Sequence, residues 1–334
     1  MKPIIRLFFG LFFVSATHAQ IRVVNYNVHY CSADMEAMDT VLDAASEDGT
    51  CGDAFPVSIF LFQEVHDGVQ NTLHRLVGDE YSMASYTNKN EISGRAESGG
   101  AQAMFYHSMQ LIEKPDDHKD IYTGATRNAD RWHLVGIGEN SDVDLWVYSV
   151  HLKASKGSRN KKQRLFGAEA ILEDIAGLPE GAHVIVAGDM NFYSVGEPAY
   201  QAFVHVLVDP LGTDEWKGED DPKKDTQSPR KIREGGLASG GLDDRFDFQF
   251  ISKSLQDSIG LDIIAGSYHS LGNDGKHYDI AINDGDNHFL KSDVARSNAL
   301  ATALHDASDH LPVIADYAYI EAAPKSPEIP HTNP

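Results

Sequence analysis

Residues His183–Ser194 read HVIVAGDMNFYS, and this stretch decides the fold of the chain. The apolar run 184–187 is typical of a strand that is buried on both faces. Gly188 then permits a turn, and Asp189 and Asn191 follow it. In open α/β sheets, ligands bind at this carboxyl end of a central strand. The carboxylate and the amide suit a polarised or metal-held phosphate, although Gly, Asp and Asn are also the residues of an ordinary turn.

The composition is that of a globular protein, with 42% hydrophobic and 23% charged residues in a chain of 334. The formal net charge is −22. A uniformly acidic surface repels nucleic acid, because affinity for it rests on neutralising phosphates. The acidity can equally serve solubility. The charge is uneven, however, since residues 153–164 read KASKGSRNKKQR and form one dense basic stretch. The sequence therefore predicts an acidic protein with a local anion-binding surface.

The N-terminal segment has the pattern of a secretory signal peptide. Lys2 and Arg6 form a basic start, residues 7–14 are apolar, and Thr17 and Ala19 suit a cleavage site after Ala19. The apolar run is shorter than the roughly 20 residues that span a bilayer. We therefore expect residues 1–20 to be a signal peptide, and the mature protein to be secreted or periplasmic without a transmembrane segment.

The rest of the chain divides in two. We expect one catalytic domain over residues 21–320, followed by a tail over 321–334 that carries four prolines and is disordered. Cys31 and Cys51 are the two cysteines, and in an exported protein a disulfide between them would persist. A helix expected over residues 34–46 lies between them. The bridge therefore requires either a short helix or an extended return of the chain.

Polar side chains follow two neighbouring strands near the start of the mature chain. Residues 21–28 read IRVVNYNV, and the apolar run 57–62 is followed by Gln63 and Glu64. A strand, a helix and a parallel strand form a right-handed crossover, so both strands finish at the same edge of the sheet. Asn27 and Glu64 should therefore lie close together. Their oxygens are hard ligands suited to Mg²⁺ or Ca²⁺.

Later segments place further polar groups at strand ends. His151 follows the apolar strand 145–150 and directly precedes the basic stretch. Residues 245–251 alternate, which puts Asp247 on the face opposite the Phe residues. An adjacent pair, Asp309 and His310, precedes a final strand. Each of these side chains alone could simply be solvated or paired.

Together the strand ends offer eight polar groups: Asn27, Glu64, His151, Asp189, Asn191, Asp247, Asp309 and His310. Phosphodiester cleavage needs an activated water, an in-line approach, neutralised phosphate oxygens and help for the leaving oxygen. A histidine can serve as the base, a buried aspartate can fix its tautomer, and a divalent ion can polarise the phosphate. The set predicts phosphoester hydrolysis.

Six motifs resemble, in order, those of the endonuclease/exonuclease/phosphatase superfamily, the deoxyribonuclease I-like hydrolases. They are NYNV (25–28), LFQEV (61–65), SVHLK (149–153), AGDMN (187–191), RFDF (245–248) and SDHLPV (308–313). The chain is also similar to exported bacterial members of that superfamily. The resemblance implies an α/β (α+β) fold, a four-layer α/β/β/α sandwich of two packed mixed β-sheets with outer helices.

The resemblance also implies a metal site and a base. Asn27 and Glu64 would bind Mg²⁺, with Asp309 as a further ligand and Mn²⁺ or Ca²⁺ as alternative ions. His310 would be the general base on the attacking water, held in place by Asp247.

The remaining residues would act on the phosphate. His151 would bind the scissile phosphate and stabilise its charge, or act as an acid. Asp189 and Asn191 would orient nucleophile and phosphate, unless Asp189 instead protonates or guides the leaving group. Arg131 sits where relatives place a phosphate-contacting arginine before a strand. Lys153, the last residue of SVHLK, would also bind phosphate.

These features predict a secreted, Mg²⁺-dependent hydrolase of phosphodiester bonds, an endonuclease-like nuclease that acts on nucleic acid as a monomer. The sequence does not rank DNA against RNA. A phosphatase or a lipid-headgroup phosphodiesterase of the sphingomyelinase kind is an alternative on the same scaffold, because the net charge is negative. A non-catalytic binding module is a remote alternative, since all eight groups are retained.

Overall fold

The structure of the protein is a computed structural model that describes residues 20–50, 52, 54–89, 97, 99–124, 127–216, 218–219 and 221–320. The expected signal peptide up to Ala19, Cys51 and the tail 321–334 lie outside these residues. Cleavage after Ala19 and the Cys31–Cys51 disulfide therefore stay predictions. No helix of the described part is long and apolar enough to cross a membrane.

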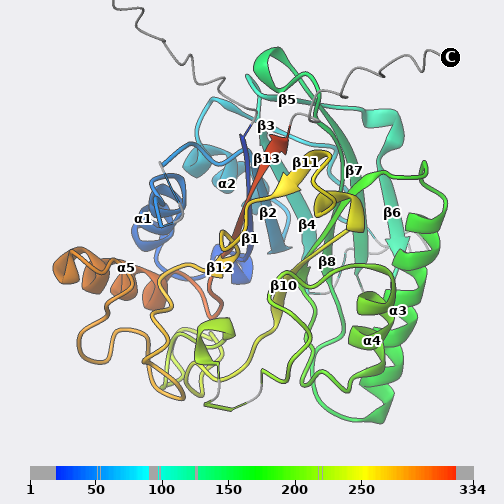
Figure 1. Ribbon diagram of the computed structural model, residues 1–334. Helices are drawn as coiled ribbons and strands as arrows, with labels where there is room; N and C mark the ends of the chain where they lie inside the picture. The colour runs from blue at the N-terminus through cyan, green and yellow to red at the C-terminus, as the bar shows by residue number, and fades with distance from the viewer. Residues whose placement is uncertain are drawn as a thin grey trace, which may run out of the picture.

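Within the described residues, two mixed β-sheets pack face to face (Figure 1). The first has seven strands in the order β11-β13-β1-β2-β4-β3, with β12 beside β13. Its strands are β1 (Gln20–Asn27), β2 (Ile59–Val65), β3 (Tyr81–Met83), β4 (Ala101–His107), β11 (Gly260–Ile263), β12 (His269–Ser270) and β13 (Val313–Ile320).

The second sheet has six strands in the order β10-β9-β8-β7-β5, with β6 beside β7. Its strands are β5 (Leu111–Glu113), β6 (Lys119–Tyr122), β7 (Asn128–Gly136), β8 (Asp144–His151), β9 (His183–Asp189) and β10 (Asp247–Ile251).

Helices cover the outer face of each sheet (Figure 1). On the seven-stranded sheet lie α1 (Met35–Ser46), α2 (Val69–Val77) and α5 (Val294–Ala307). On the six-stranded sheet lie α3 (Ser158–Ala176) and α4 (Pro198–Val206). One apolar cluster fills the space between the sheets and another lies under each helical layer. The expected four-layer α/β/β/α sandwich is confirmed.

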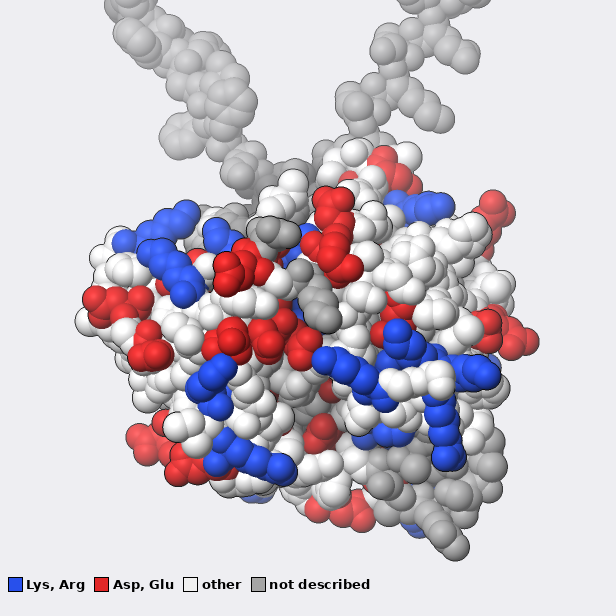
Figure 2. All heavy atoms as spheres, turned by 90° about the horizontal axis from the view of Figure 1, so that it is seen from below, with Lys and Arg blue, Asp and Glu red and all other residues white. Residues whose placement is uncertain are grey.

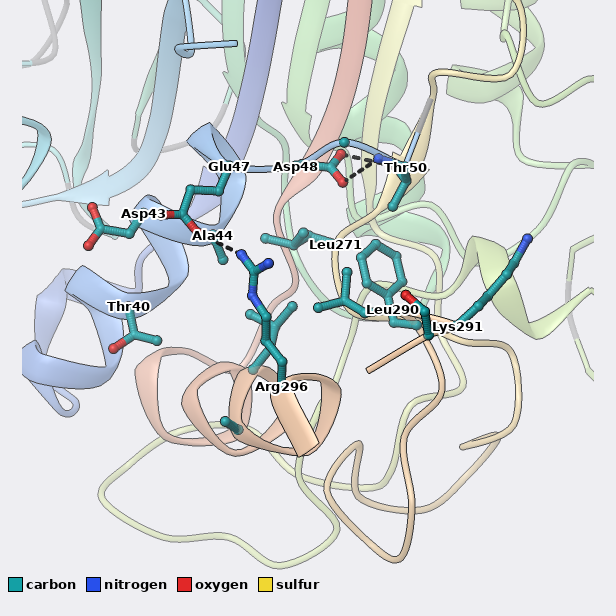
Figure 3. A pocket seen from close by; sticks show the side chains of 15 residues that line it. Thr40, Asp43, Ala44, Glu47, Asp48, Thr50, Leu271, Leu290, Lys291 and Arg296 are labelled. Atoms are coloured by element: carbon teal, nitrogen blue, oxygen red, sulfur yellow. Dashed lines mark hydrogen bonds and ion pairs between the residues drawn. The ribbon is translucent and has the colours of Figure 1, made fainter. Parts of the chain in front are cut away.

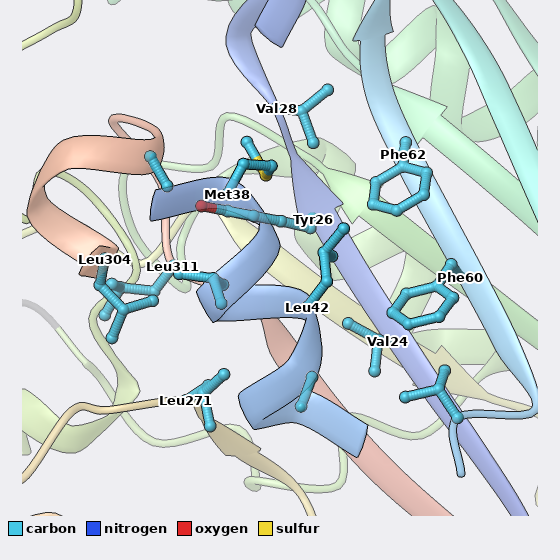
Figure 4. Packing of buried hydrophobic residues seen from close by; sticks show 14 of the residues in the cluster. Val24, Tyr26, Val28, Met38, Leu42, Phe60, Phe62, Leu271, Leu304 and Leu311 are labelled. Carbon is cyan, nitrogen blue, oxygen red and sulfur yellow. The ribbon is translucent and has the colours of Figure 1, made fainter. Parts of the chain in front are cut away.

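The helix α1 shows how the sequence produces one of these layers. Asp34 caps its N-terminus, because the carboxylate accepts hydrogen bonds from the N–H groups of Glu36 and Ala37. Apolar residues recur at helical spacing and are buried: Met38, Val41, Leu42 and Ala45. Figure 4 shows side chains of this helix packed against aromatic residues of β1 and β2.

Strand pairing brings the strand ends together. β1 and β2 pair in parallel with Asn27 opposite Gln63, as the crossover predicted. β8 and β9 also pair in parallel, with His151 opposite Asp189. β10 runs antiparallel to β9 and places Asp247 opposite that same Asp189. The register of three strands therefore fixes the side chains of three predicted site residues at one edge.

Two features of the fold differ from expectation. β7 spans Asn128–Gly136, so Arg131, which was expected before a strand, lies inside it. The short strands β3, β5, β6, β11 and β12 were not expected. They have two to four residues each and lack a long apolar run.

Candidate active site

The eight predicted strand-end groups meet in one buried network, called here the strand-end cluster. Direct contacts link Asn27, Glu64, His151, Asp189, Asn191, Asp247 and His310. Asp309 joins through His29, whose Nδ1 lies 3.6 Å from Asp309 Oδ1 and 3.5 Å from Glu64 Oε2. Side chains from segments spread over most of the chain therefore converge on one edge of the sandwich.

Asp189 is the centre of this cluster. Its Oδ2 accepts a hydrogen bond from Asn27 Nδ2 at 3.2 Å and lies 3.2 Å from His151 Nε2. Its Oδ1 accepts one from Asn191 Nδ2 at 2.8 Å. The preceding Gly188 has φ 144°, and a Cβ there would lie 1.8 Å from the Val150 carbonyl oxygen. Only glycine allows β9 to approach β8 so closely and turn Asp189 into the cluster.

His310 and Asp247 form a buried pair, 2.7 Å apart between Nδ1 and Oδ2. The other ring nitrogen, Nε2, lies 2.6 Å from Gln227 Nε2 and 3.8 Å from Asp189 Oδ2. Burial alone would lower the pKa of His310, but Asp247, Asp189 and Asp309 together raise it to about 10. A proton on Nδ1 is thus held by Asp247, and Nε2 faces the cluster.

His151 has the opposite electrostatic environment. Burial, together with the charges of Arg127, His310 and Lys153, holds the pKa of His151 well below its ordinary value of 6.5. The Arg127 guanidinium donates hydrogen bonds to the carbonyl oxygens of His151 at 2.9 Å and Leu152 at 3.1 Å. The two histidines of the cluster therefore differ in protonation, since His310 favours the charged form and His151 the neutral form.

The acidic side of the cluster fits a divalent cation. Asp309 Oδ1 is buried and accepts no hydrogen bond within the described part of the chain. Glu64 has φ 61°, which is rare for a residue with a side chain and aims its carboxylate into the cluster. Glu64, His151 and Asp189 also offer ligand atoms within 4.8 Å of one another. Carboxylate oxygens with few other donors are what a hard cation needs.

Asn27 fits this site less directly. Its Oδ1 accepts a hydrogen bond from the His29 N–H at 3.1 Å. Its Nδ2 therefore faces Glu64 Oε1 and donates to it at 3.2 Å. The amide would have to turn over before Asn27 could offer oxygen to a cation.

Comparisons with known proteins identify the fold. No protein-family model and no curated protein matches the chain. An endonuclease/exonuclease/phosphatase family protein from Bacteroides thetaiotaomicron superposes with a TM-score of 0.58 at 15% identity, over 91% of this chain and 99% of that one. The chain has the endonuclease/exonuclease/phosphatase fold.

Other structures with the endonuclease/exonuclease/phosphatase fold are similarly distant. D. rerio TDP2, solved with a single-strand DNA product, has a TM-score of 0.58 and 15% identity over 90% of this chain and 99% of that chain. A mannosyl-6-phosphatase from Bacteroides thetaiotaomicron has a TM-score of 0.55 and 15% identity over 89% and 99%. Identities this low establish the fold alone, so residue roles here rest on the contacts described above.

The structure does not bring Arg131 to the strand-end cluster. Its Nη1 pairs with Asp174 Oδ2 of α3 at 2.8 Å, and its Nε donates to the Asp117 carbonyl oxygen at 3.2 Å. In the sheet it lies opposite Tyr148, three residues before His151 and therefore roughly 10 Å along the strand. The arginine that lies beside the cluster is Arg127, which donates to the carbonyl oxygens of His151 and Leu152.

Lys153 lies beside the cluster. Its Nζ donates to the Ala154 carbonyl oxygen at 3.2 Å, and its side chain is partly exposed. Burial and the neighbouring cations Arg127 and Arg164 lower the pKa of Lys153. Its positive charge is thus available at the margin of the site.

Sequence reasoning missed two contacts of the cluster. His29 follows Asn27 by two residues and is the first residue of a single turn, His29–Cys31. All three residues of this turn have positive φ. Gln227 comes from the long loop 209–235, where nothing in the sequence marks it. Proximity to the NYNV motif could have pointed to His29, but only the fold could reveal Gln227.

A cavity of about 590 Å³ lies apart from this chemistry, between α1 and α5 (Figure 3). Its lining includes Asp43, Glu47, Leu271, Phe289 and Arg296 and none of the strand-end cluster. We therefore assign the chemistry to the cluster and not to this cavity.

The charges near the site are segregated. Figure 2 views the molecule from the end towards which β1 and β2 run, and Lys and Arg side chains gather on its right, the side of α3. Asp and Glu side chains lie side by side near the centre. Lys156, Arg159 and Lys162 of the basic stretch are exposed, whereas Arg164 is buried against Glu197. The basic stretch thus provides a cationic surface at the flank of the cluster.

Proposed function

We propose that the protein is a secreted hydrolase of phosphodiester bonds that depends on Mg²⁺, with Mn²⁺ or Ca²⁺ as alternatives, and that acts on nucleic acid as a nuclease. The observation that carries this proposal is the His310–Asp247 pair at 2.7 Å beside a cluster of carboxylates that fits a cation. An oriented histidine next to a phosphate-polarising site is the arrangement that water activation requires.

His310 acts as the general base. Asp247 fixes its Nδ1 proton. Because the raised pKa keeps Nε2 protonated in the metal-free protein, Nε2 accepts a proton from the attacking water only after losing its own, which the charge of a bound cation would favour. Gln227 Nε2 lies 2.6 Å from that nitrogen. The Gln227 side chain must therefore move aside, or share this position with the attacking water. Glu64 and Asp309, with Asn27 once its amide has turned over, would hold the cation, which would supply positive charge against the phosphate.

The other members of the cluster act on the phosphate. With its one proton on Nδ1, which has no hydrogen-bond partner among the described residues, neutral His151 donates a hydrogen bond to a phosphate oxygen or to the leaving oxygen. Nε2 then accepts from protonated Asp189, whose pKa burial raises to about 7. Asn191 offers its amide, and Asp189 orients both side chains through the contacts at 3.2 Å and 2.8 Å. Lys153 adds positive charge at the margin. Arg127 holds the backbone that carries His151.

The substrate surface favours a nucleic-acid strand. A depression of about 530 Å³ beside the basic stretch is lined by Arg159 and Lys162 together with Tyr122 and Phe166. These two residues are 37% and 48% exposed, and their rings contact each other edge to face with centroids 6.0 Å apart. Proteins that bind single-stranded nucleic acid use cationic side chains along the phosphates, and aromatic side chains on which the bases stack.

A substrate panel tests this function. Purified protein with Mg²⁺ is given plasmid DNA, RNA, a single-stranded oligonucleotide, bis-(p-nitrophenyl) phosphate, p-nitrophenyl phosphate and sphingomyelin. We expect cleavage of the nucleic acids and the diester, lost on adding EDTA. Cleavage of the monoester alone would establish a phosphatase, and cleavage of sphingomyelin alone a lipid phosphodiesterase. Turnover that persists in EDTA would refute the metal dependence.

A further inference from the structure

A second group of metal-ligating side chains lies away from the strand-end cluster, at the β6 edge of the six-stranded sheet (Figure 1). Asp120 of β6 and Asp130 of β7 are directly opposite each other in the strand register. His118 precedes β6. One ligand atom from each of these three residues lies within 4.8 Å of the others. We call these residues, with Glu97, the β6–β7 cluster.

The carboxylates of this cluster are buried with little to balance them. Asp130 is 1% exposed, and its Oδ2 has no hydrogen-bond partner within the described ranges. Asp120 Oδ1 accepts a hydrogen bond from Thr87 Oγ1 at 2.7 Å and lies 3.7 Å from His118 Nε2. No Lys or Arg of the described residues forms an ion pair with Asp120 or Asp130.

Glu97 adds a third carboxylate. It is 7% exposed, its Oε1 accepts a hydrogen bond from the Asn128 N–H at 2.9 Å, and its Oε2 has no partner in the part of the chain described. Burial, then repulsion from Asp120, raises the pKa of Glu97 to about 8. Burial, with Asp120 and Glu97, raises the pKa of Asp130 well above its ordinary value.

Buried carboxylates without a compensating charge cost several kcal/mol each, so such a group must either hold protons or bind a cation. A shared proton would satisfy two carboxyl groups but gives no reason for an imidazole to converge on them. One imidazole with two or three carboxylates is a ligand set for Mn²⁺ or Zn²⁺, whereas Mg²⁺ prefers oxygen ligands and keeps most of its water.

We propose that His118, Asp120 and Asp130, with Glu97 completing the set, bind a structural divalent cation of the Mn²⁺ or Zn²⁺ class, separate from the catalytic site. The ion joins β6, β7 and Glu97 into one unit. Because Glu97 also accepts the Asn128 N–H, next to Arg127, the ion braces the strand that leads to the catalytic edge. This proposal does not depend on the reaction that the strand-end cluster performs.

Mn²⁺ binding to the purified protein, counted by electron paramagnetic resonance of free Mn²⁺, tests the proposal. Asp130→Asn keeps the shape of the side chain and removes the ligand charge. Asp116→Asn, an exposed acid before β6, is the matched control. We expect two Mn²⁺ per chain in the unmodified protein and in Asp116→Asn, and one in Asp130→Asn. Glu64→Gln should remove the catalytic ion alone, and the double variant with Asp130→Asn should bind none.

Thermal unfolding gives a second readout. Saturating Mn²⁺ should raise the Tm of Glu64→Gln, and this rise should disappear in the double variant Glu64→Gln/Asp130→Asn. If Asp130→Asn folds poorly, Asp120→Asn is a second variant at the same site. Equal Mn²⁺ counts in Asp130→Asn and Asp116→Asn would overturn the proposal. So would a carboxylic-acid infrared band that survives saturating Mn²⁺ and vanishes in Asp130→Asn, because the cluster would then share a proton.

Discussion

The strand-end cluster and the β6–β7 cluster both bury several carboxylates, but they balance them differently. At the strand-end cluster, Asp189 and Asp247 each meet a histidine or an amide within 3.2 Å. Both clusters hold carboxylate oxygens without a hydrogen-bond partner among the described residues, namely Asp247 Oδ1 and Asp309 Oδ1 in the first and Asp130 Oδ2 in the second. In the β6–β7 cluster the nearest imidazole nitrogen, His118 Nε2, lies 3.7 Å from Asp120 Oδ1. We infer that the first arrangement serves proton transfer next to a cation. We infer that the second arrangement binds a cation mainly because the cation stabilises its buried carboxylates.

Loss of the catalytic cation should give the largest difference between the two clusters, because it should affect turnover but not the Mn²⁺-dependent rise in Tm. Glu64→Gln removes a ligand charge at the strand-end cluster, so phosphodiester turnover should fall on the order of 100-fold or more. The same variant should keep the Mn²⁺-dependent rise in Tm that we assign to the β6–β7 cluster. Steady-state kinetics on a single-stranded oligonucleotide measure the first effect. A Glu64→Gln enzyme with normal turnover would remove the metal from our mechanism.

Arg127 and Arg131 lie close together in the sequence and provide a matched pair of variants. Arg127→Met removes the hydrogen bonds that hold the His151 and Leu152 carbonyls and should lower kcat by roughly 10- to 100-fold, because misplacement of a catalytic group is costly. Arg131→Met removes the pair with Asp174 and the hydrogen bonds to the Asp117 carbonyl oxygen, all away from the cluster, and should leave kcat within about twofold. Equal losses of kcat in both variants would contradict the positions described here.

The raised pKa of His310 gives a pH test on metal-free protein. Since its pKa of about 10 exceeds the ordinary 6.5, its contribution to stability is complete below pH 6.5 and is lost as the pH rises through about 10. In EDTA, Tm should therefore fall between pH 7 and 10 more steeply in the natural protein than in Asp247→Asn, which lacks the main charge partner. Parallel Tm curves for the two proteins would count against the buried ion pair.

The basic stretch should affect binding modestly. Lys156→Ala and Lys162→Ala each remove one exposed cation, so the slope of log affinity for single-stranded DNA against log salt should fall by about 1 per substitution. Glu173→Ala on the same helix is the control and should leave that slope unchanged. Fluorescence anisotropy at several salt concentrations measures the slope. Unaltered slopes for both Lys variants would place the nucleic acid elsewhere.

The sequence predicted the strand-end cluster because its parts are local. Continuous apolar runs mark buried strands, and polar residues directly after them must lie at the sheet edge. The parallel pairing of β1 with β2 needed only the crossover rule. The α/β/β/α sandwich followed from the resemblance carried by the same motifs.

The remaining features depend on tertiary pairing. The β6–β7 cluster forms because Asp120 and Asp130 lie opposite each other on two paired strands. The sequence did not predict β6, because this strand has no apolar run. Arg131 was expected at the site from the resemblance, which places such an arginine before a strand, whereas here β7 begins at Asn128 and includes Arg131. Gln227 reaches His310 from a loop whose path no local pattern encodes.

We propose that the His310–Asp247 pair activates water for phosphodiester hydrolysis. Single-turnover cleavage of a single-stranded oligonucleotide by His310→Gln, at saturating Mg²⁺ and with folding checked by circular dichroism, tests it most directly. Loss of a general base predicts a rate lower by about 10²- to 10⁴-fold with little change in oligonucleotide binding. A His310→Gln rate within a few-fold of the unmodified protein would contradict the account.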